Sequence, residues 1–391
     1  MAPIRVALIG LSSSAKTAWA ATAHLPYLLS PAGLAKFQIV ALLNSSTDAA
    51  RKAIEFYKLP ASTRAYGSPS DLAADPDVDL VVCNTRVDVH EATIAASVEA
   101  GKAVFCEWPL AQNSEVAAAL VSKAEKAGAL DKTVVGLQGR VFPLVENLRR
   151  VIASGRIGKV LSSEVRVFGG LNDRVILPRT LQYFTRSEVG GNIYKIGFGH
   201  VLDTVQSVVG DVEKDPETGK AVHGHFQLQR PQVKIRDADG TITETVTSDV
   251  PDLILVAGTL PESPRTQKGA TLHYRFRRGQ PFPGEPILSW SINGEKGEIR
   301  VVSPGGAFLN IGVENPPITA ELYDFETDKV TPLEWEWADW QKDLPMPARN
   351  IGGLYEAFAA AQEGGEVGYP TFGSALARHK QLEELISGWK A

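Results

Sequence analysis

The sequence lacks the features that would place it in several specialised classes of protein. Its 391 residues include two cysteines, Cys83 and Cys106, which are too few for a disulfide framework. Both lie inside apolar runs typical of strands, and neither has another metal-ligating residue close by in the sequence. We therefore expect buried thiols in a reducing compartment, and no metal site.

Long apolar runs and an excess of basic residues are also missing. No run approaches the roughly 20 residues that a membrane-spanning helix requires, and the N-terminus has no charged segment followed by the apolar core of a signal peptide. The net charge of −5 and the pI near 5.9 argue against nucleic acid as a direct partner, because phosphate binding requires a basic face. These absences favour a globular protein of the cytosol, or of cytosol and nucleus, without a membrane partner.

What the sequence does contain begins at its N-terminus. Ile4–Ile9 is an almost wholly apolar run of strand length, Gly10 interrupts it, and an Ala- and Trp-rich stretch typical of a helix follows. A strand, a glycine turn and a helix N-terminus form an anion site, because backbone N–H groups and the helix dipole face the ligand. The usual dinucleotide fingerprint has three glycines, whereas Ser12, Ser13 and Ser14 follow here. A buried strand that leads into a helix is the alternative interpretation.

The order of elements predicts two domains. Strands and helices alternate up to about residue 138, which predicts a parallel sheet covered by helices on both faces. From about Val160 strand-like segments recur and helices become scarce. We therefore predict an α/β protein with a Rossmann dinucleotide-binding domain over residues 1–138. An α+β domain with a large, mostly antiparallel open sheet follows over residues 139–391, for substrate binding and dimerisation, and its C-terminal helices could pack back on the first domain.

Parallel sheets of this kind bind ligands beyond the C-terminal ends of their strands. The candidate cofactor-binding residues therefore directly follow the predicted strands or begin the next helix. They are Gly10, Ser12, Ser13, Ser14, Asn44, Ser45, Ser46, Arg51, Asn84, Thr85, Arg86, His90, Glu107, Trp108, Pro109 and Gln138.

The end of the second strand indicates which cofactor is bound. An acidic residue there would bind the adenosine ribose hydroxyls and repel a 2′-phosphate. This chain instead has Asn44, Ser45 and Ser46, with Arg51 further on. Because a guanidinium binds phosphate in a bidentate way, we expect NADP(H), with NAD(H) as the alternative. Arg51 could equally be an ordinary surface residue of a helix.

Several phrases of the sequence resemble a known family. GKAVFCEWPLA at 101–111, GRIGKV at 155–160 and GGNIYKIGFGHVLD at 190–203 are similar to the glucose–fructose oxidoreductase and inositol dehydrogenase family. LQGR at 137–140 and YPTFGSALARH at 369–379 resemble its branch that includes the fungal galactose-regulon repressor. The resemblance implies a nicotinamide dinucleotide across the strand ends, with the second domain's sheet as the substrate wall.

The sequence departs from this family at its catalytic positions. In the family's Glu-Lys-Pro motif the Glu contacts the nicotinamide ribose and the Lys acts at the substrate's oxygen. Glu107 and Pro109 keep the motif, whereas Trp108 replaces the Lys, and an indole has no useful pKa. The family also has an Asp and a His one helical turn apart. His200 matches the His, but Ile196 occupies the Asp position.

These departures leave the function open between two classes. The first is an oxidoreductase acting on a small sugar, polyol, carbonyl, hydroxyl or imine compound, with His200, Lys195 or Tyr194 as the acid. In the alternative interpretation, His200 is a histidine of the core, and Lys195 is solvated or faces a phosphate. The rival is a dinucleotide-binding regulator that needs no proton donor, and dinucleotide-assisted elimination is a third alternative. An open sheet has a second face to cover, so we expect a homodimer or larger homo-oligomer.

Overall fold

The computed structural model describes residues 2–13, 18–169, 173–213, 223–307, 309, 311–312 and 315–391. The chain forms two compact units. The first comprises residues 1–138 and 338–379, and the second comprises residues 139–337 and 380–391. The chain leaves the first unit after Gln138, where the sequence predicts a domain boundary, and returns to it for residues 338–379.

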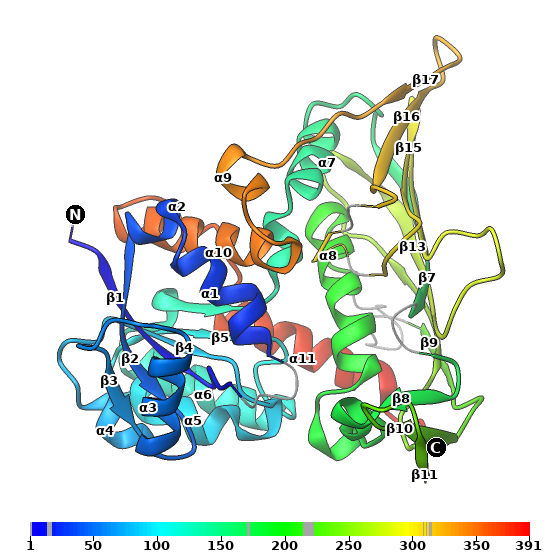
Figure 1. The fold of residues 1–391 in the computed structure, drawn as a ribbon. Helices are drawn as coiled ribbons and strands as arrows, with labels where there is room; N and C mark the ends of the chain where they lie inside the picture. Colours follow the sequence, from blue (N-terminus) through cyan, green and yellow to red (C-terminus); the bar gives the residue numbers. More distant parts are fainter. Residues whose placement is uncertain are drawn as a thin grey trace. The chain divides into compact units, whose positions relative to one another are not determined.

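The first unit is built on a six-stranded parallel sheet (Figure 1). Its strands are β1 (Ile4–Ile9), β2 (Phe37–Leu43), β3 (Arg64–Tyr66), β4 (Leu80–Cys83), β5 (Ala103–Cys106) and β6 (Thr133–Val135). Their spatial order is β3-β2-β1-β4-β5-β6. The chain reverses its winding direction between β1 and β4, which is where doubly wound sheets bind ligands. The predicted Rossmann-like sheet is thus confirmed.

Helices enclose this sheet, and its strands are apolar because both faces are buried. All four residues of β4 (LVVC) and of β5 (AVFC) are buried. The longer helices are α3 (Thr47–Phe56), α5 (His90–Glu99), α6 (Ser114–Lys126) and α10 (Met346–Gln362). The shorter ones are a π-helix (Ala20–His24), α1 (Leu25–Leu28), α2 (Pro31–Leu34), α4 (Pro69–Ala73) and α9 (Asp339–Lys342). The helix α11 (Phe372–Ile386) begins in the first unit and ends in the second.

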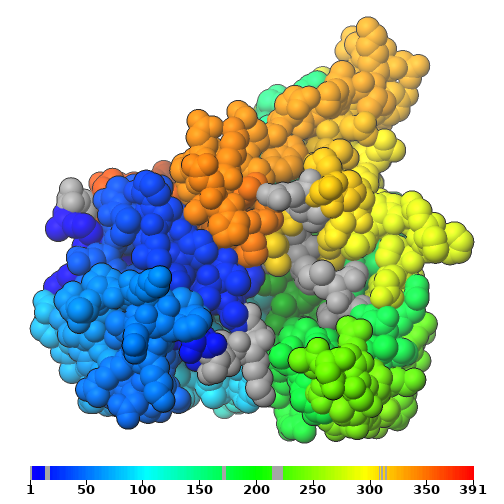
Figure 2. Space-filling view, viewed as in Figure 1, coloured from blue at the N-terminus to red at the C-terminus, as the bar shows by residue number. Residues whose placement is uncertain are grey.

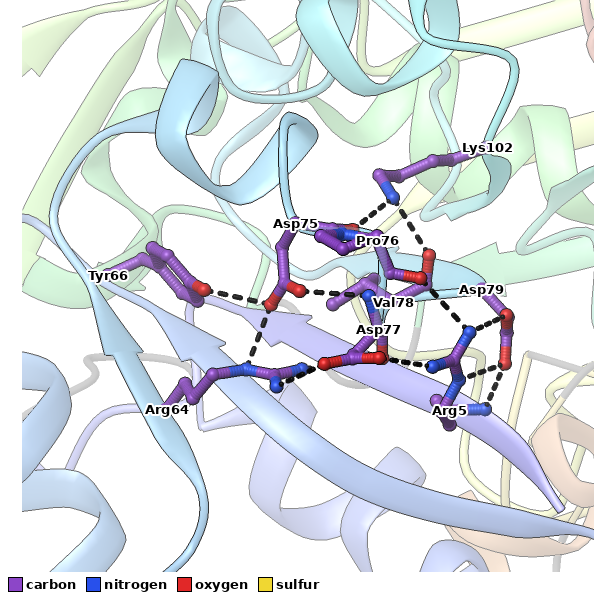
Figure 3. A network of polar contacts seen from close by, with 9 residues as sticks. All are labelled: Arg5, Arg64, Tyr66, Asp75, Pro76, Asp77, Val78, Asp79 and Lys102. Atoms are coloured by element: carbon purple, nitrogen blue, oxygen red, sulfur yellow. Dashed lines mark hydrogen bonds and ion pairs between the residues drawn. The ribbon is translucent and has the colours of Figure 1, made fainter.

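A polar network ties together the N-terminal ends of the strands (Figure 3). The guanidinium of Arg5 contacts Asp77 at 2.7 Å and Asp79 at 2.8 Å, while Arg64 pairs with Asp75 at 2.9 Å. Lys102 donates to the carbonyl of Val78 at 2.9 Å. These contacts join the starts of β1, β3 and β5 to the segment before β4, so the network lies at the edge opposite the one at which ligands are expected.

The second unit contains an eight-stranded sheet with the order β17-β16-β15-β14-β7-β13-β12-β9. Its strands are β7 (Val160–Gly169), β9 (His223–Gln227), β12 (Leu253–Thr259), β13 (Thr266–Arg278), β14 (Leu288–Gly294), β15 (Gly297–Ser303), β16 (Thr319–Asp324) and β17 (Lys329–Pro332). Only the pairing of β7 with β13 is parallel among the described strands of this sheet. The predicted mostly antiparallel sheet is thus confirmed.

Burial alternates along these strands, as it does in sheets with one covered face. Every second residue of β14 is buried. The helices α7 (Pro143–Ala153) and α8 (Gly199–Val209) lie on one face of the sheet (Figure 1). A π-helix (Ile193–Phe198) leads into α8, and its Phe198 ring stacks on Tyr274 of β13 with centroids 4.6 Å apart. The hairpin of β16 and β17 projects from the body of its unit (Figure 2).

A smaller sheet and an aromatic cluster complete the second unit. The sheet has the order β11 (Ile242–Thr247), β10 (Gln232–Arg236), β8 (Ile176–Pro178). Trp335 and Trp337 pack on Phe142 with ring centroids 4.9 and 5.0 Å away. Trp335 and Trp337 therefore pack within their own unit. No helix among the described residues combines the length and apolarity needed to cross a membrane.

Candidate functional site

The turn after β1 brings two loops of the first unit close together. Gly10 has a φ of +87°, a conformation that favours glycine. A Cβ on it would lie 3.1 Å from the carbonyl oxygen of Asn84, in the loop after β4. Ser12 and Ser13 follow this turn, whereas Ser14 lies outside the described residues. The structure thus brings Gly10 close to the backbone of Asn84, and the approach to a pyrophosphate that the sequence predicts for Gly10 stays a prediction.

The end of β2 carries the residues expected to read the adenosine ribose. The Asn44 amide donates to the carbonyl of Leu11 at 2.8 Å, which joins this strand end to the first loop. The Ser46 hydroxyl caps α3 by accepting from the backbone N–H of Ala49 at 3.1 Å. Ser45 is exposed. The side chain of Arg51 is 70% exposed and lies 3.3 Å from Asp48. This ion pair is weak enough for the guanidinium to turn toward an anion.

Two amide side chains at the strand ends have polar atoms without partners. The amide oxygen and nitrogen of Asn84 are both buried, and neither meets a hydrogen-bond partner among the described residues. The amide oxygen of Gln138 is in the same situation, on a residue that is 1% exposed. A buried polar group without a partner costs stability, so such atoms in a native fold indicate a bound group or water. These residues fit a polar ligand at this edge.

The other candidate residues after β4 contact partners within the first unit. Arg86 donates to Asp88 at 2.6 Å. The carbonyl of Thr85 lies 2.9 Å from Nε2 of His90, whose ring is buried and also approaches Cys106. The structure thus places His90 beneath the strand ends among sulfur atoms, and its ring does not extend into the loop.

Glu107 is held in place by two buried residues that the sequence did not single out. Its carboxylate accepts from Nε2 of His24 at 2.8 Å, and Nδ1 of that ring lies 2.9 Å from the hydroxyl of Tyr355 on α10. A carboxylate only accepts, so Nε2 carries the proton and Nδ1 accepts from the tyrosine. A Cβ on Gly136 would lie 2.6 Å from the other carboxylate oxygen of Glu107. The absence of a side chain at Gly136 therefore leaves room for the carboxylate, and His24 holds it there.

Trp108, the residue in place of the family's lysine, is buried. Its indole is 5% exposed, and its centroid lies 4.8 Å from that of the His379 ring on α11. The following Pro109 is joined to it by a cis peptide bond. The indole packs within the first unit and offers no proton-transfer chemistry there.

In the second unit, the predicted acids fall into different environments. The hydroxyl of Tyr194 donates to the carbonyl of Leu382 at 2.5 Å, and burial raises the pKa of this phenol well above its ordinary value. Lys195 lies 3.6 Å from Glu383, and its side chain is 12% exposed. Burial lowers the pKa of Lys195, although Glu383 counteracts the shift. Tyr194 therefore holds its proton firmly, whereas Lys195 releases its proton more readily than an ordinary lysine.

His200 lies in the first turn of α8 and is buried. Burial lowers its pKa to about 4, while the charge of Asp203 opposes the shift. Asp203 is itself held by Arg140 through bonds of 2.9 and 2.7 Å. The imidazole of His200 is therefore neutral at pH 7 and can accept a proton or donate a neutral hydrogen bond. It does not carry the extra proton of a general acid.

Few features of the sequence point to His24, Tyr355 and Gly136, which sequence analysis did not identify. His24 stands alone in an apolar helical stretch, and Tyr355 lies 331 residues away along the chain. Gly136 follows β6 directly, which is the one signal that placed it near the strand-end edge. The clamp on the Glu107 carboxylate, which His24, Tyr355 and Gly136 form, therefore depends on tertiary contacts.

The fold and the strand-end edge are those of a dinucleotide-binding protein. Residues 4–134 match the oxidoreductase family with an NAD-binding Rossmann fold. Residues 143–303 match the C-terminal domain of Gal80p. These two matches agree with the resemblance to the glucose–fructose oxidoreductase and inositol dehydrogenase family, and the second unit is similar to that of Gal80p.

Individual relatives include both a dehydrogenase and regulators. The dehydrogenase aclE of Aspergillus oryzae is 29% identical over 77% of this chain and 77% of its own length. The galactose/lactose metabolism regulatory protein GAL80 of Kluyveromyces lactis is 27% identical over 78% of this chain and 65% of its own length. The structure of a super-repressor mutant of Gal80p from Saccharomyces cerevisiae superimposes with a TM-score of 0.83. It has 22% identity and covers 100% of this chain and 98% of that one, which shows the shared fold.

Proposed function

We propose that this protein is an NAD(P)-dependent oxidoreductase that prefers NADP(H). Its substrate is a sugar, a polyol or another small carbonyl, hydroxyl or imine compound. The observation that carries the proposal is Lys195, a mostly buried lysine with a lowered pKa in the segment that resembles the family's catalytic one. Lysines with lowered pKa values gather at catalytic sites, where they transfer protons.

The first unit supplies the residues that would hold the dinucleotide. Asn84 and Gln138 offer buried amide atoms without partners among the described residues, and Glu107 offers a carboxylate fixed by His24. Gly10 keeps the first loop close to the backbone at Asn84. A nicotinamide cofactor would supply the hydride chemistry, and these residues would hold and orient it. This set fits a polar, hydroxyl-bearing ligand.

Proton transfer is assigned to Lys195, with His200 as a neutral hydrogen-bond donor or proton acceptor. Lys195 would take over the function of the lysine that Trp108 displaces, because burial lowers its pKa and makes its ammonium a readier proton donor than that of an ordinary lysine. The hydroxyl of Tyr194 is bound to a backbone carbonyl, so we assign it a structural role. The sequence proposed all three residues as acids, and their surroundings favour only Lys195.

Turnover tests this assignment directly. The protein is incubated with NADPH or NADH and a panel of sugars, aldehydes, ketones and imines, and with the oxidised cofactors and polyols, while absorbance reports the nicotinamide. We expect Lys195→Gln to lower kcat about 10²–10⁴-fold, the usual effect of losing a general acid, with cofactor affinity unchanged. The matched control is Lys234→Gln, which removes an exposed lysine of β10. Full turnover by Lys195→Gln would remove Lys195 from the mechanism.

Cofactor preference has its own test. The exposed guanidinium of Arg51 pairs only weakly with Asp48, so it can bind a 2′-phosphate. We expect Arg51→Ala to weaken NADP(H) binding by about 1.5–3 kcal/mol, as for a charged hydrogen bond, and to leave NAD(H) binding unchanged. Lys52→Ala, on the next exposed residue of α3, is the control. Equal losses for both cofactors would contradict a role in reading the phosphate.

A second candidate function rests on Trp108. A buried indole packed on His379 and an apolar Ile196 remove both proton-transfer groups of the family motif. This favours a regulator that binds the dinucleotide without reacting it. Tight dinucleotide binding in calorimetry, with no turnover by any substrate class in the panel, would support the regulator and contradict the enzyme.

A further inference from the structure

Two cysteines and a histidine meet inside the first unit, although the sequence separates them. The sulfur atoms of Cys83 and Cys106 and a ring nitrogen of His90 lie within 4.8 Å of one another. All three residues are buried, with exposures of 0%, 0% and 1%, and both cysteines are free thiols. Among the described residues, this is the one group of three His, Cys, Asp or Glu side chains arranged to hold a metal ion.

The topology of the sheet produces this cluster. Cys83 ends β4 and Cys106 ends β5, and the two residues are directly opposite each other in the parallel register. Neighbours in register point to the same face of a sheet, so both thiols face the same side. The helix α5 packs on β4 and β5 and begins with His90, which places the ring at the strand ends.

The hydrogen bonds of His90 set its ring in the state of a metal ligand. Its Nε2 lies 2.9 Å from the carbonyl oxygen of Thr85, which can only accept, so Nε2 carries the proton. In the neutral ring Nδ1 then has a lone pair, and it lies 3.3 Å from Sγ of Cys106. Nδ1 is equally 3.3 Å from the carbonyl of Leu110, a contact that is a hydrogen bond only when the ring is doubly protonated. A backbone carbonyl that orients the ring in this way is typical of metal-bound histidine.

We propose that Cys83, His90 and Cys106 form a binding site for a thiophilic d¹⁰ cation, either Zn²⁺ or Cu⁺. Two thiolates and an imidazole are soft ligands that select these ions. Binding releases the two thiol protons to solvent and involves no change of oxidation state. Zn²⁺ would leave the buried site neutral, which lowers the cost of burying charge.

The two ions make different demands on the surroundings. Zn²⁺ in structural sites has four ligands, and the hydroxyls of Thr85 and Thr93 lie 3.3 and 3.4 Å from Sγ of Cys83, where either could become the fourth. Cu⁺ is satisfied by the three ligands already present. A tetrahedral Zn²⁺ site has ligand atoms about 3.7 Å apart, a spacing between the 3.3 Å that separates Nδ1 from Sγ of Cys106 and the 4.8 Å limit of the cluster.

The position of the site links it to the dinucleotide edge. Cys83 directly precedes Asn84, and Cys106 directly precedes Glu107. A metal ion would fix the ends of both strands from which these candidate cofactor residues project. Its role would be to stabilise the first unit and steady the loops, and this role holds whether or not the protein is an oxidoreductase.

Metal loading of the full chain tests the proposal. The reduced protein is freed of metal with a chelator, incubated with Zn²⁺, or with Cu⁺ under anaerobic conditions, and desalted, and bound metal is measured by mass spectrometry. We expect one equivalent of one ion to be retained, with a rise in the thermal midpoint. Co²⁺ used as a probe should give a thiolate charge-transfer band. Cys83→Ser, Cys106→Ser and His90→Gln should each lower retention at least tenfold, while His225→Gln, on an exposed residue of β9, should not.

Three outcomes would overturn the site. The first is that the folded wild-type protein retains neither ion. The second is that both cysteine variants, shown to be folded by circular dichroism, bind as much metal as the wild type does. The third is that thiol titration of denatured protein purified without reductant finds no free thiol, because the pair is then a disulfide. Retention of Zn²⁺ alone or of Cu⁺ alone would support the site and identify its ion.

Discussion

His200 illustrates how one buried residue makes stability depend on pH. In the folded chain its pKa is about 4, because burial disfavours the charged ring, whereas an unfolded histidine has a pKa of about 6.5. The unfolded state therefore binds the proton more readily between these values. The stability that the neutral ring contributes is present above about pH 6.5 and is lost as the pH falls toward 4.

We expect this loss to amount to about 3 kcal/mol, because each unit of pKa difference corresponds to about 1.4 kcal/mol. Urea unfolding at pH 7 and at pH 4.5 measures it. In His200→Gln, which cannot be charged, the fall in stability between the two pH values should be smaller by most of this amount. His225→Gln, at an exposed position, is the control. An identical fall in the wild type and in His200→Gln would show that His200 is not buried as a neutral ring.

Adding one methyl group at Gly136 tests whether the position of the Glu107 carboxylate matters for binding. A Cβ there would stand 2.6 Å from Oε2 and 2.8 Å from the carboxylate carbon, closer than atoms can approach. Gly136→Ala should therefore displace the carboxylate and weaken dinucleotide binding about tenfold in calorimetry, a loss of about 1.4 kcal/mol. Gly368→Ala is the matched control, since nothing lies within 4 Å of its added Cβ. Unchanged affinity in Gly136→Ala would mean that Glu107 does not contact the ligand.

The clamp on Glu107 also tests how separate elements share one site. Tyr355 on α10 holds His24, which holds Glu107 after β5. Tyr355→Phe leaves the ring and removes the hydroxyl, so we expect a loss of about 1–3 kcal/mol in unfolding free energy and weaker dinucleotide binding. Tyr66→Phe removes a hydroxyl that donates to Asp75 at 2.8 Å, within the polar network that precedes β4 (Figure 3). It should lower stability without changing affinity, and a drop in affinity for it would show that the effect is not specific to the clamp.

The elements that sequence patterns predicted are the long apolar ones. Ile4–Ile9 forms a strand with the bounds of its apolar run, because burial on both faces leaves a continuous apolar run. The short strands β3 and β17 were missed, since three or four residues are too few to show a pattern. In the candidate site, strand-end positions such as Asn84 follow from the parallel topology. The clamp of His24 and the cluster of Cys83 with His90 depend on tertiary contacts that no spacing encodes.

At the scale of the whole molecule, the exposed face of the eight-stranded sheet is more polar than the sequence analysis assumed. The sequence predicted an apolar face that a partner must cover. The face instead contains an open cavity of about 680 Å³ with many polar lining residues. His273 of β13 pairs in register with Glu164 of β7 on one side and with Ala257 on the other. Self-association through this face would therefore rest on hydrogen bonds and charges as well as on apolar contact.

We propose that this face mediates a homodimer, and Leu255 provides the test. Leu255 is 36% exposed and stands opposite Arg275, which is opposite Arg166 on β7. Leu255→Arg adds a third guanidinium to this row, so like charges would have to be buried together and association should fail. Light scattering at micromolar concentration should give twice 42.1 kDa for the wild type and 42.1 kDa for the variant. Phe282→Arg changes a side chain that is 73% exposed and does not line the cavity, so it should stay dimeric. A wild-type particle of monomer mass would contradict the dimer, and a dimer that survives Leu255→Arg would place the interface on another surface.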